Sequence, residues 1–243
     1  MAYTKDELLS NLEKELENKL LPPGEKDYSC LYTANMINYI GNATGTSTPY
    51  TEFIGEKLFK EGFIQNGLIT DIRAITRGKS YYTKSHEKFT VDKDSNRVEE
   101  NFVKSLFFYN PFKKQIGSPI DYQTPLKNIS KDKAGKIDLI TYNEKSNELF
   151  LVEVKDDDSK ETALRACLEI QTYFQAVDKD KLLNDFYEAG KITSNKATIK
   201  KVILFFKGSN PANELVDLSN RTYLKRVIDE FDIKICILDI KGE

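Results

Sequence analysis

One 21-residue stretch restricts the fold of this chain more than any other part of it. Residues 135–155 read GKIDLITYNEKSNELFLVEVK, with a short apolar run on each side of a polar segment. The two runs have the length of β-strands and the polar segment suits a turn, so the stretch predicts a β-hairpin. However, Asp138 lies within the first run, and Glu153 and Lys155 lie within the second. Ionised groups are rarely buried in strands without a partner.

The alternation of side chains along a strand predicts where these charges point. Glu153 and Lys155 share one face with Leu149 and Leu151, and they are separated by about 7 Å along the strand. A hairpin would bring Asp138 to the same end of the sheet. Burying such groups unpaired costs several kcal/mol each, so either a salt bridge or a bound cation has to offset that cost.

The types of residue indicate which cation would fit. Two carboxylates with no histidine or cysteine nearby are hard oxygen ligands, which suit Mg²⁺ or Mn²⁺ better than zinc. A neighbouring lysine can hold an anionic oxygen or orient a water molecule. Together these are the groups that hydrolysis of a phosphodiester requires, because charge develops on the phosphate oxygens in the transition state.

The pattern from residue 93 onward predicts an α/β domain over residues 93–243. A helix in RVEENFVKSLFF precedes a weak strand in DYQTPL and then the hairpin. A helix over about 160–177 follows, with Asp158 and Glu161 spaced as a capping box. A buried strand in KKVILFF, a helix over about 211–230 with Pro211 near its start, and a strand in IKICILDI complete the order. This is a mixed sheet flanked by helices.

Residues 1–92 are predicted to be a mostly helical accessory region. A first helix begins at Thr4 with Glu7 closing a capping box, and a second is expected within YSCLYTANMINYIG. A third begins in STPYTEFIGEKLFKEGF, with Thr48 as its cap and Pro49 in its first turn. KSYYTKSHEKFTV is either an edge strand or a loop. No Gly/Ser-rich linker separates the two regions, so no hinge is expected between them.

Composition excludes several functional classes. The 243 residues are 40% hydrophobic and 30% charged, and no apolar run approaches the roughly 20 residues of a membrane helix. This composition therefore predicts a protein without a membrane partner. The three scattered cysteines predict reduced thiols in a cytoplasmic protein. His86 is the single histidine, which argues against a Ser–His–Asp triad and a multi-histidine zinc site. No Walker loop or GxGxxG segment is present.

Charge is distributed unevenly along the chain. The net charge of −2 argues against a protein that coats nucleic acid by bulk positive charge. Residues 104–136 nevertheless hold seven lysines and two aspartates, an excess of five positive charges directly before the hairpin. The segment is either a solvated loop or part of a surface that contacts phosphate.

Asp138, the fifteen-residue gap and the Glu153-Val154-Lys155 triplet resemble the PD-(D/E)XK nuclease superfamily. The resemblance covers about residues 93–206 and is nearest to the Mrr-like and RecB-like members and to the N-terminal nuclease modules of restriction subunits. It implies a restriction-endonuclease-like αβββαβ core and a metal-dependent nuclease. Ile137 stands where the family motif has proline.

Two helices add candidate residues. In RVEENFVKSLFF, Glu99 falls near the middle of the apolar stripe and Glu100 falls toward its border, so Glu99 is the better ligand candidate. Solvation of both glutamates is the alternative. Related nucleases carry a glutamine and a tyrosine four residues apart in the later helix. Here Glu169 and Tyr173 hold that spacing in EIQTYFQ, while Gln171 is the glutamine that could reach a phosphate or position a catalytic group. An ordinary amide at the helix edge is the alternative for Gln171.

The resulting hypothesis is an Mg²⁺- or Mn²⁺-dependent nuclease that acts on DNA, with RNA left open. Asp138, Glu153 and the carbonyl of Val154 would bind the metal, Lys155 would orient water and stabilise charge, and Glu99 would support a ligand or a second metal. Restriction, repair, recombination and mobile-element roles stay open, as does a homodimer. The alternatives are an inactive nucleic-acid- or protein-binding module on the same fold, and a salt-bridged sheet edge without chemistry.

Overall fold

A computed structural model of the chain describes residues 2–19, 32–61, 72, 74–88, 98–129 and 134–239. Five strands form one mixed sheet in the order β1-β2-β3-β4-β5. The strands are β1 (Ser118–Pro125), β2 (Lys136–Asn143), β3 (Glu148–Lys155), β4 (Thr198–Phe206) and β5 (Ile233–Leu238). Strands β1, β2 and β3 pair antiparallel, whereas β4 pairs in parallel with β3 and β5 pairs in parallel with β4. The predicted α/β class is therefore confirmed.

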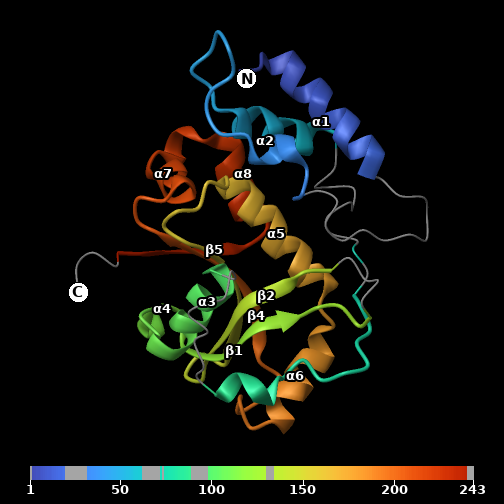
Figure 1. Ribbon diagram of the computed structural model, residues 1–243, viewed down its shortest axis with the longest axis vertical. Coiled ribbons are helices and arrows are strands. Elements are labelled where there is room, and N and C mark those ends of the chain that lie inside the picture. The colour runs from blue at the N-terminus through green and yellow to red at the C-terminus, as the bar shows by residue number, and fades with distance from the viewer. Residues whose placement is uncertain are drawn as a thin grey trace.

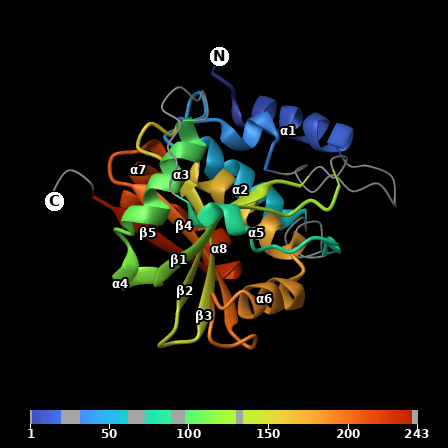
Figure 2. The ribbon, with the colours of Figure 1, turned by 60° about the horizontal axis from the view of Figure 1, so that its bottom comes forward.

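Helices cover both faces of this sheet (Figures 1 and 2). The α-helices are α1 (Lys5–Lys19), α2 (Tyr50–Lys60), α3 (Val98–Tyr109), α4 (Lys113–Ile116), α5 (Ala163–Ala176), α6 (Lys179–Glu188), α7 (Asn210–Val216) and α8 (Thr222–Glu230). Short 3-10 helices are η1 (Asn35–Asn38), η2 (Lys84–Glu87) and η3 (Leu218–Asn220). The alternation of β3 divides its side chains between the two faces, since Leu149 and Leu151 pack in one apolar cluster and Phe150 and Val152 pack in the other.

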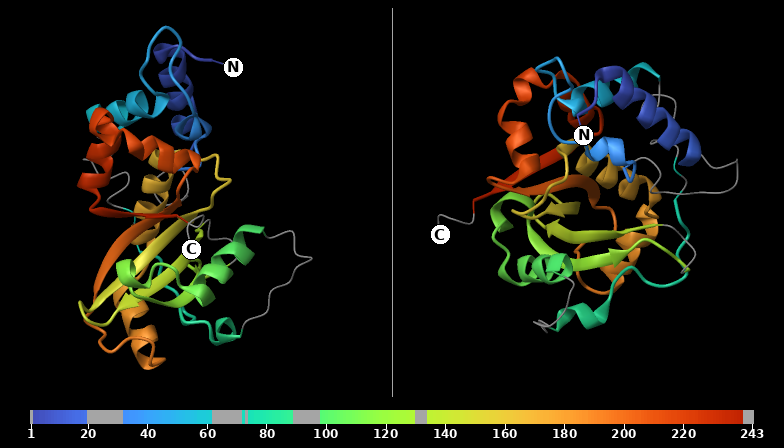
Figure 3. Two further views of the ribbon diagram at one scale, coloured as in Figure 1. Left: turned by 90° about the vertical axis from the view of Figure 1, so that its left-hand side faces the viewer. Right: turned by 45° about the horizontal axis from the view of Figure 1, so that its top comes forward.

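The two apolar clusters define three layers. The smaller cluster joins α3 and the following turn to the sheet through Val103, Leu106 and Phe112. The larger cluster lies on the opposite face, where α5 packs against β3 and β4. In Figures 1 and 3, α1, α2, α7 and α8 gather at one end of the molecule, and the sheet with α6 lies at the other.

The described part of the N-terminal region shares a core with the rest of the chain. Leu8, Ile54 and Tyr81 belong to the same cluster of buried residues as α5 and α8. Glu52 on α2 also accepts hydrogen bonds from the backbone amides of Tyr223 and Leu224, at 2.9 and 3.0 Å, and so caps α8. The expected boundary at residues 92 and 93 lies outside the described residues.

Several predicted elements are confirmed. The capping box of α1 is present, because Thr4 N donates to Glu7 Oε2 at 2.8 Å and Glu7 N donates to Thr4 Oγ1 at 3.3 Å. The hairpin, α3, β4 and β5 lie where the sequence predicts them. Pro211 lies in the first turn of α7, and Ser209 caps that helix.

Other predictions were wrong at helix ends and in irregular segments. Of the helix expected in residues 28–41, the described part holds only the short η1, and residues 28–31 lie outside it. Pro49 itself is the cap residue of α2, and Thr48 makes no capping bond. Of the two alternatives for residues 79–91, the described part, 79–88, contains η2 and no strand and so agrees with the loop, whereas residues 89–91 lie outside the described ranges. The helices α4 and α6 were not predicted.

The C-terminal half of the chain requires two more corrections. Helix α5 begins at Ala163 and is capped by Thr162, so Asp158 and Glu161 do not form its capping box. The helix expected over 211–230 is two helices joined by η3, where Asn220 Nδ2 donates to Asp217 Oδ1 at 2.6 Å. Such local side-chain bonds compete with a continuous helix.

Candidate active site

The hairpin brings Asp138 and Glu153 to one edge of the sheet. The last pair in the β2–β3 register is Leu139 with Val152, so Asp138 and Glu153 are the next residues on the two strands. Asp138 is 7% exposed and Glu153 is 2% exposed. Asp138 Oδ2 accepts from the backbone N of Val154 at 3.0 Å, and its Oδ1 accepts from Gln123 Nε2 at 2.9 Å. These two bonds fix the orientation of the Asp138 carboxylate.

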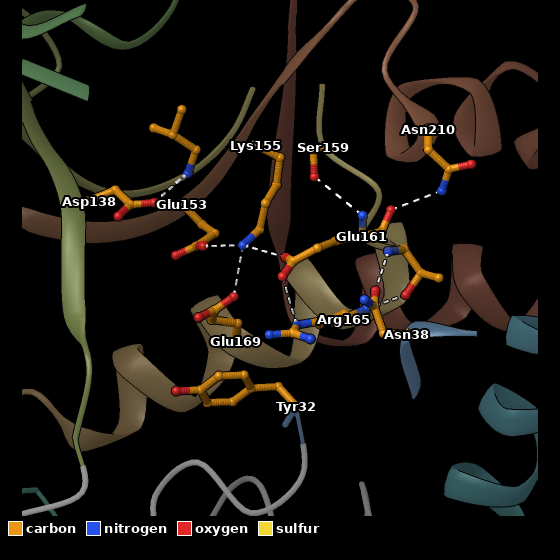
Figure 4. A network of polar contacts seen from close by, with 12 residues as sticks. Tyr32, Asn38, Asp138, Glu153, Lys155, Ser159, Glu161, Arg165, Glu169 and Asn210 are labelled. Carbon is orange, nitrogen blue, oxygen red and sulfur yellow. Dashed lines mark hydrogen bonds and ion pairs between the residues drawn. The ribbon is translucent and has the colours of Figure 1, made fainter. Parts of the chain in front are cut away.

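Lys155 lies at the centre of the charged groups (Figure 4). Its Nζ is 2.7 Å from Glu153 Oε1, 2.7 Å from Glu161 Oε2 and 3.0 Å from Glu169 Oε2. Glu153 lies on β3 and Glu169 lies on α5, whereas Glu161 lies in the segment that leads into α5. The ammonium therefore joins the sheet edge to the start of α5. The predicted shared face of Glu153 and Lys155 is confirmed by their contact.

These groups line a cavity of about 310 Å³. The lining residues are Glu99, Glu100, Gln123, Lys136, Asp138, Glu153, Lys155, Glu161, Arg165, Glu169 and Tyr173. Six carboxylates thus face three basic groups, and the cavity has an excess of negative charge. A second cavity of about 270 Å³, lined in part by Glu99, Lys155 and Asp156, adjoins it. An excess of carboxylates in an enclosed space favours the binding of a cation or of protons.

Burial and like charge shift the proton affinities of these groups. Burial raises the pKa of Asp138 to about 7, although Lys155 and the Val154 amide act in the opposite direction. Burial, with Asp138 and Glu169 adding to it, raises the pKa of Glu153 well above its ordinary value. Burial lowers the pKa of Lys155, but the surrounding carboxylates outweigh it and hold that pKa well above the ordinary value. Lys155 is therefore protonated at neutral pH and cannot act as a base.

Glu169 and Tyr173 form the helix side of the cavity. Tyr173 donates its hydroxyl to Glu169 Oε1 at 2.8 Å. Burial raises the pKa of Glu169, but the bonds from Lys155 and Tyr173 outweigh it, so the pKa is lowered and Glu169 is ionised. The Tyr173 hydroxyl is also 3.4 Å from that of Tyr32, a residue of the N-terminal region. A Cβ atom on Gly135 would lie 2.2 Å from the Tyr173 hydroxyl, so only glycine leaves room for the tyrosine.

The glutamates of α3 reach the cavity in a different way from the one predicted. Both Glu99 and Glu100 line it. Glu99 is solvent-exposed at the rim and is not buried in the apolar stripe, although partial removal from water raises its pKa. Glu100 is half-buried and its Oε1 lies 2.7 Å from Lys136 Nζ. Of the two α3 glutamates, Glu99 is thus the one that lines both cavities.

Gln171 does not line the cavity. It is 3% exposed, and its Oε1 accepts a hydrogen bond from Lys201 Nζ on β4 at 2.7 Å. The prediction that Gln171 faces a phosphate was therefore wrong. Glu169 and Tyr173 line the cavity but were not predicted as site residues, although their four-residue spacing was a signal that could have identified them. Sequence reasoning also missed Arg165, which lines the cavity and whose Nε is 3.1 Å from Glu161 Oε1.

The donor set fits a hard divalent cation in part. Among the described residues, no group of three His, Cys, Asp or Glu side chains is arranged to hold a metal ion. The Lys155 ammonium already lies between the carboxylates at the distances quoted above. However, Glu153 Oε2 is buried and has no hydrogen-bond partner, which leaves one carboxylate oxygen unsatisfied. An ion held by Asp138, Glu153 and the Val154 carbonyl would satisfy that oxygen.

Comparison with known proteins adds no relative: no family model, curated protein or solved structure matches the chain. In the described ranges, no helix has the length and apolar character needed to cross a membrane. Cys167 and Cys236 are free and buried, and Cys30 lies outside the described residues.

Proposed function

We propose that this chain is a metal-dependent nuclease of the PD-(D/E)XK type that hydrolyses phosphodiester bonds in DNA. The order α3, β1, β2, β3, α5, β4 supports the αβββαβ core that the sequence resemblance implies. In this chain, three antiparallel strands precede a helix and a strand that pairs in parallel with the third. α4 and α6 are additions to that order.

One observation carries the proposal. Asp138, Glu153 and Lys155, chosen from their positions in the hairpin, line a single polar cavity. Two buried carboxylates with raised pKa values and one buried ammonium are an expensive arrangement for stability alone. Perturbed groups of this kind cluster where chemistry takes place.

Each residue has a distinct task in this mechanism. Asp138, Glu153 and the Val154 carbonyl would hold Mg²⁺ or Mn²⁺, which supplies an activated water and stabilises charge on the phosphate. Lys155 keeps its proton and contributes a fixed positive charge beside the phosphate that is attacked. Glu169 and Tyr173 hold the lysine in position. Water adds to phosphorus and loses a proton to solvent, while the ester oxygen leaves and takes up a proton from solvent, so that a phosphate end and a hydroxyl end result.

The charge of the cavity agrees with a requirement for a cation. Because carboxylates outnumber basic groups there, a DNA phosphate would be repelled by the cavity without added positive charge. Asp138 is half protonated near pH 7, and a proton competes with a cation for the same oxygens. Cation binding and cleavage should therefore both strengthen from pH 6 to pH 8.

Cleavage of supercoiled plasmid, linear duplex, single-stranded DNA and RNA with Mg²⁺ or Mn²⁺ tests the proposal. We expect nicking or cutting of DNA by the full chain, and a loss of roughly 100-fold or more in Lys155→Met and Glu153→Gln. Lys201→Met is the matched control, because Lys201 is also a buried lysine against α5 but bonds to Gln171 outside the cavity. It should retain cleavage even if the variant is less stable.

A folded chain that cuts none of these substrates and binds neither metal by calorimetry would refute the nuclease proposal and favour the binding-module alternative. Equal loss of cleavage in Lys201→Met and Lys155→Met would show that the effect is one of stability. Light scattering at working concentration tests self-association.

A further inference from the structure

Another cavity lies away from the candidate active site. It has a volume of about 770 Å³, within the range of small-molecule sites. It is lined at the turn of the hairpin by Tyr142, Asn143, Glu144 and Lys145, together with residues of α4, β1 and the loop after α6. Asn143 is five residues along β2 from Asp138, so the two cavities are separated by roughly 17 Å.

The charge of this cavity is opposite to that of the active site. Four lysines, 113, 114, 145 and 191, line it against the single Glu144. Lys191 is paired with Glu87, at 2.6 Å. Lys113, Lys114 and Lys145 are exposed, and no carboxylate of the described part of the chain pairs with them. Three ammonium groups from two separate segments therefore give this cavity an excess of positive charge, which attracts an anion.

Hydrogen bonds and a close backbone contact hold the walls of the cavity together. The Tyr142 hydroxyl donates to Asn147 Oδ1 at 2.9 Å and lies 2.8 Å from Thr193 Oγ1, so it ties β2 to the loop after α6. Gly117 has φ +83°, and a Cβ there would lie 2.3 Å from the Tyr142 carbonyl oxygen. This glycine allows the end of α4, with its lysines, to approach β2 closely.

From these observations we infer that the cavity is a binding site for a compact polyphosphate anion. Lysines act as point charges for phosphate, and several of them around one cavity suit a ligand with several adjacent negative charges. The polyphosphate could be an inorganic di- or triphosphate or the phosphate chain of a nucleotide. The inference is independent of the nuclease proposal, because it involves none of the residues of the acidic cavity.

The test is calorimetric binding of pyrophosphate, ATP and orthophosphate to the full chain in EDTA at constant ionic strength. We expect pyrophosphate or ATP to bind at least tenfold more tightly than orthophosphate. Removal of two charged contacts in Lys113→Ala/Lys114→Ala should weaken binding roughly 10- to 100-fold, and Lys145→Glu should do the same. All three lysines are exposed, so these variants should fold normally.

The matched control is Lys127→Ala/Lys196→Ala, which removes two exposed lysines outside the cavity and should leave the affinity unchanged. Tighter binding of ATP than of pyrophosphate would identify a nucleotide, and equal binding would identify the free anion. The inference is overturned if Lys113→Ala/Lys114→Ala binds as tightly as the unaltered chain, or if orthophosphate binds as tightly as pyrophosphate. It is also overturned if duplex DNA binds but neither polyphosphate does. None of these results depends on cleavage.

Discussion

Asp138→Asn should make the metal-free protein more stable at high pH, even though it removes a residue of the proposed active site. The folded protein binds the Asp138 proton more tightly than the unfolded chain does, because the pKa rises from 3.8 to about 7 on folding. Stability therefore falls as the pH rises between these values, and the loss is complete above about pH 7. The isosteric amide carries no charge and avoids that loss.

The size of the effect follows from the same two values. At about 1.4 kcal/mol for each tenfold change in proton affinity, the shift corresponds to about 4 kcal/mol above pH 7. At pH 5 only part of it is present, so the unaltered chain should lose about 3 kcal/mol relative to Asp138→Asn between pH 5 and pH 8. Glu153 also has a raised pKa and contributes its own pH dependence to both proteins, so the difference between them is the quantity to measure.

Urea unfolding followed by circular dichroism, in EDTA at pH 5, 6, 7 and 8, gives this difference. Asp121→Asn is a control of opposite sign. Asp121 is fully buried on the neighbouring strand, but its carboxylate has partners in His86 at 2.6 Å and Thr124 at 2.9 Å, so its removal should destabilise the fold. Unfolding free energies of Asp138→Asn and the unaltered chain that stay parallel within about 0.5 kcal/mol from pH 5 to pH 8 would refute the reasoning.

Three further predictions follow from the site and its supports. Mg²⁺ or Mn²⁺ should raise the melting temperature at pH 8 but not at pH 5, and Glu153→Gln should abolish the rise; a rise of equal size at both pH values would contradict the proton competition. Gly135→Ala should displace the Tyr173 hydroxyl and cost about 1–3 kcal/mol in urea unfolding, whereas an unchanged stability would show that the tyrosine can move freely. Thr162→Ala removes the cap of α5 and a buried hydrogen bond to the Ile37 carbonyl, so it should lower the free energy of unfolding by about 1–3 kcal/mol. Thr48→Ala is the control and should change it by less than about 0.5 kcal/mol, because Thr48 makes no capping bond; equal effects of the two substitutions would contradict the assigned caps.

The limits of sequence-based prediction are clearest in α5. Thr162 caps the helix partly because its hydroxyl donates to the carbonyl of Ile37, at 2.8 Å, and no local pattern contains that partner. Most of the helix is buried, including Glu169, Gln171 and Tyr173, so the apolar stripe does not say which polar residue faces which neighbour. The position of Lys201 on β4 decides that Gln171 turns away from the cavity.

The sequence by itself determined the hairpin, its face alternation and the meeting of Asp138, Glu153 and Lys155. These depend on strand periodicity and on a short turn, which are local properties. Only the tertiary structure decided that Glu161 and Glu169 complete the charge around Lys155, and that Glu99 stays at the rim. Those contacts join segments that are distant in sequence or differently oriented, and packing of α3 and α5 on opposite faces of the sheet sets their distances.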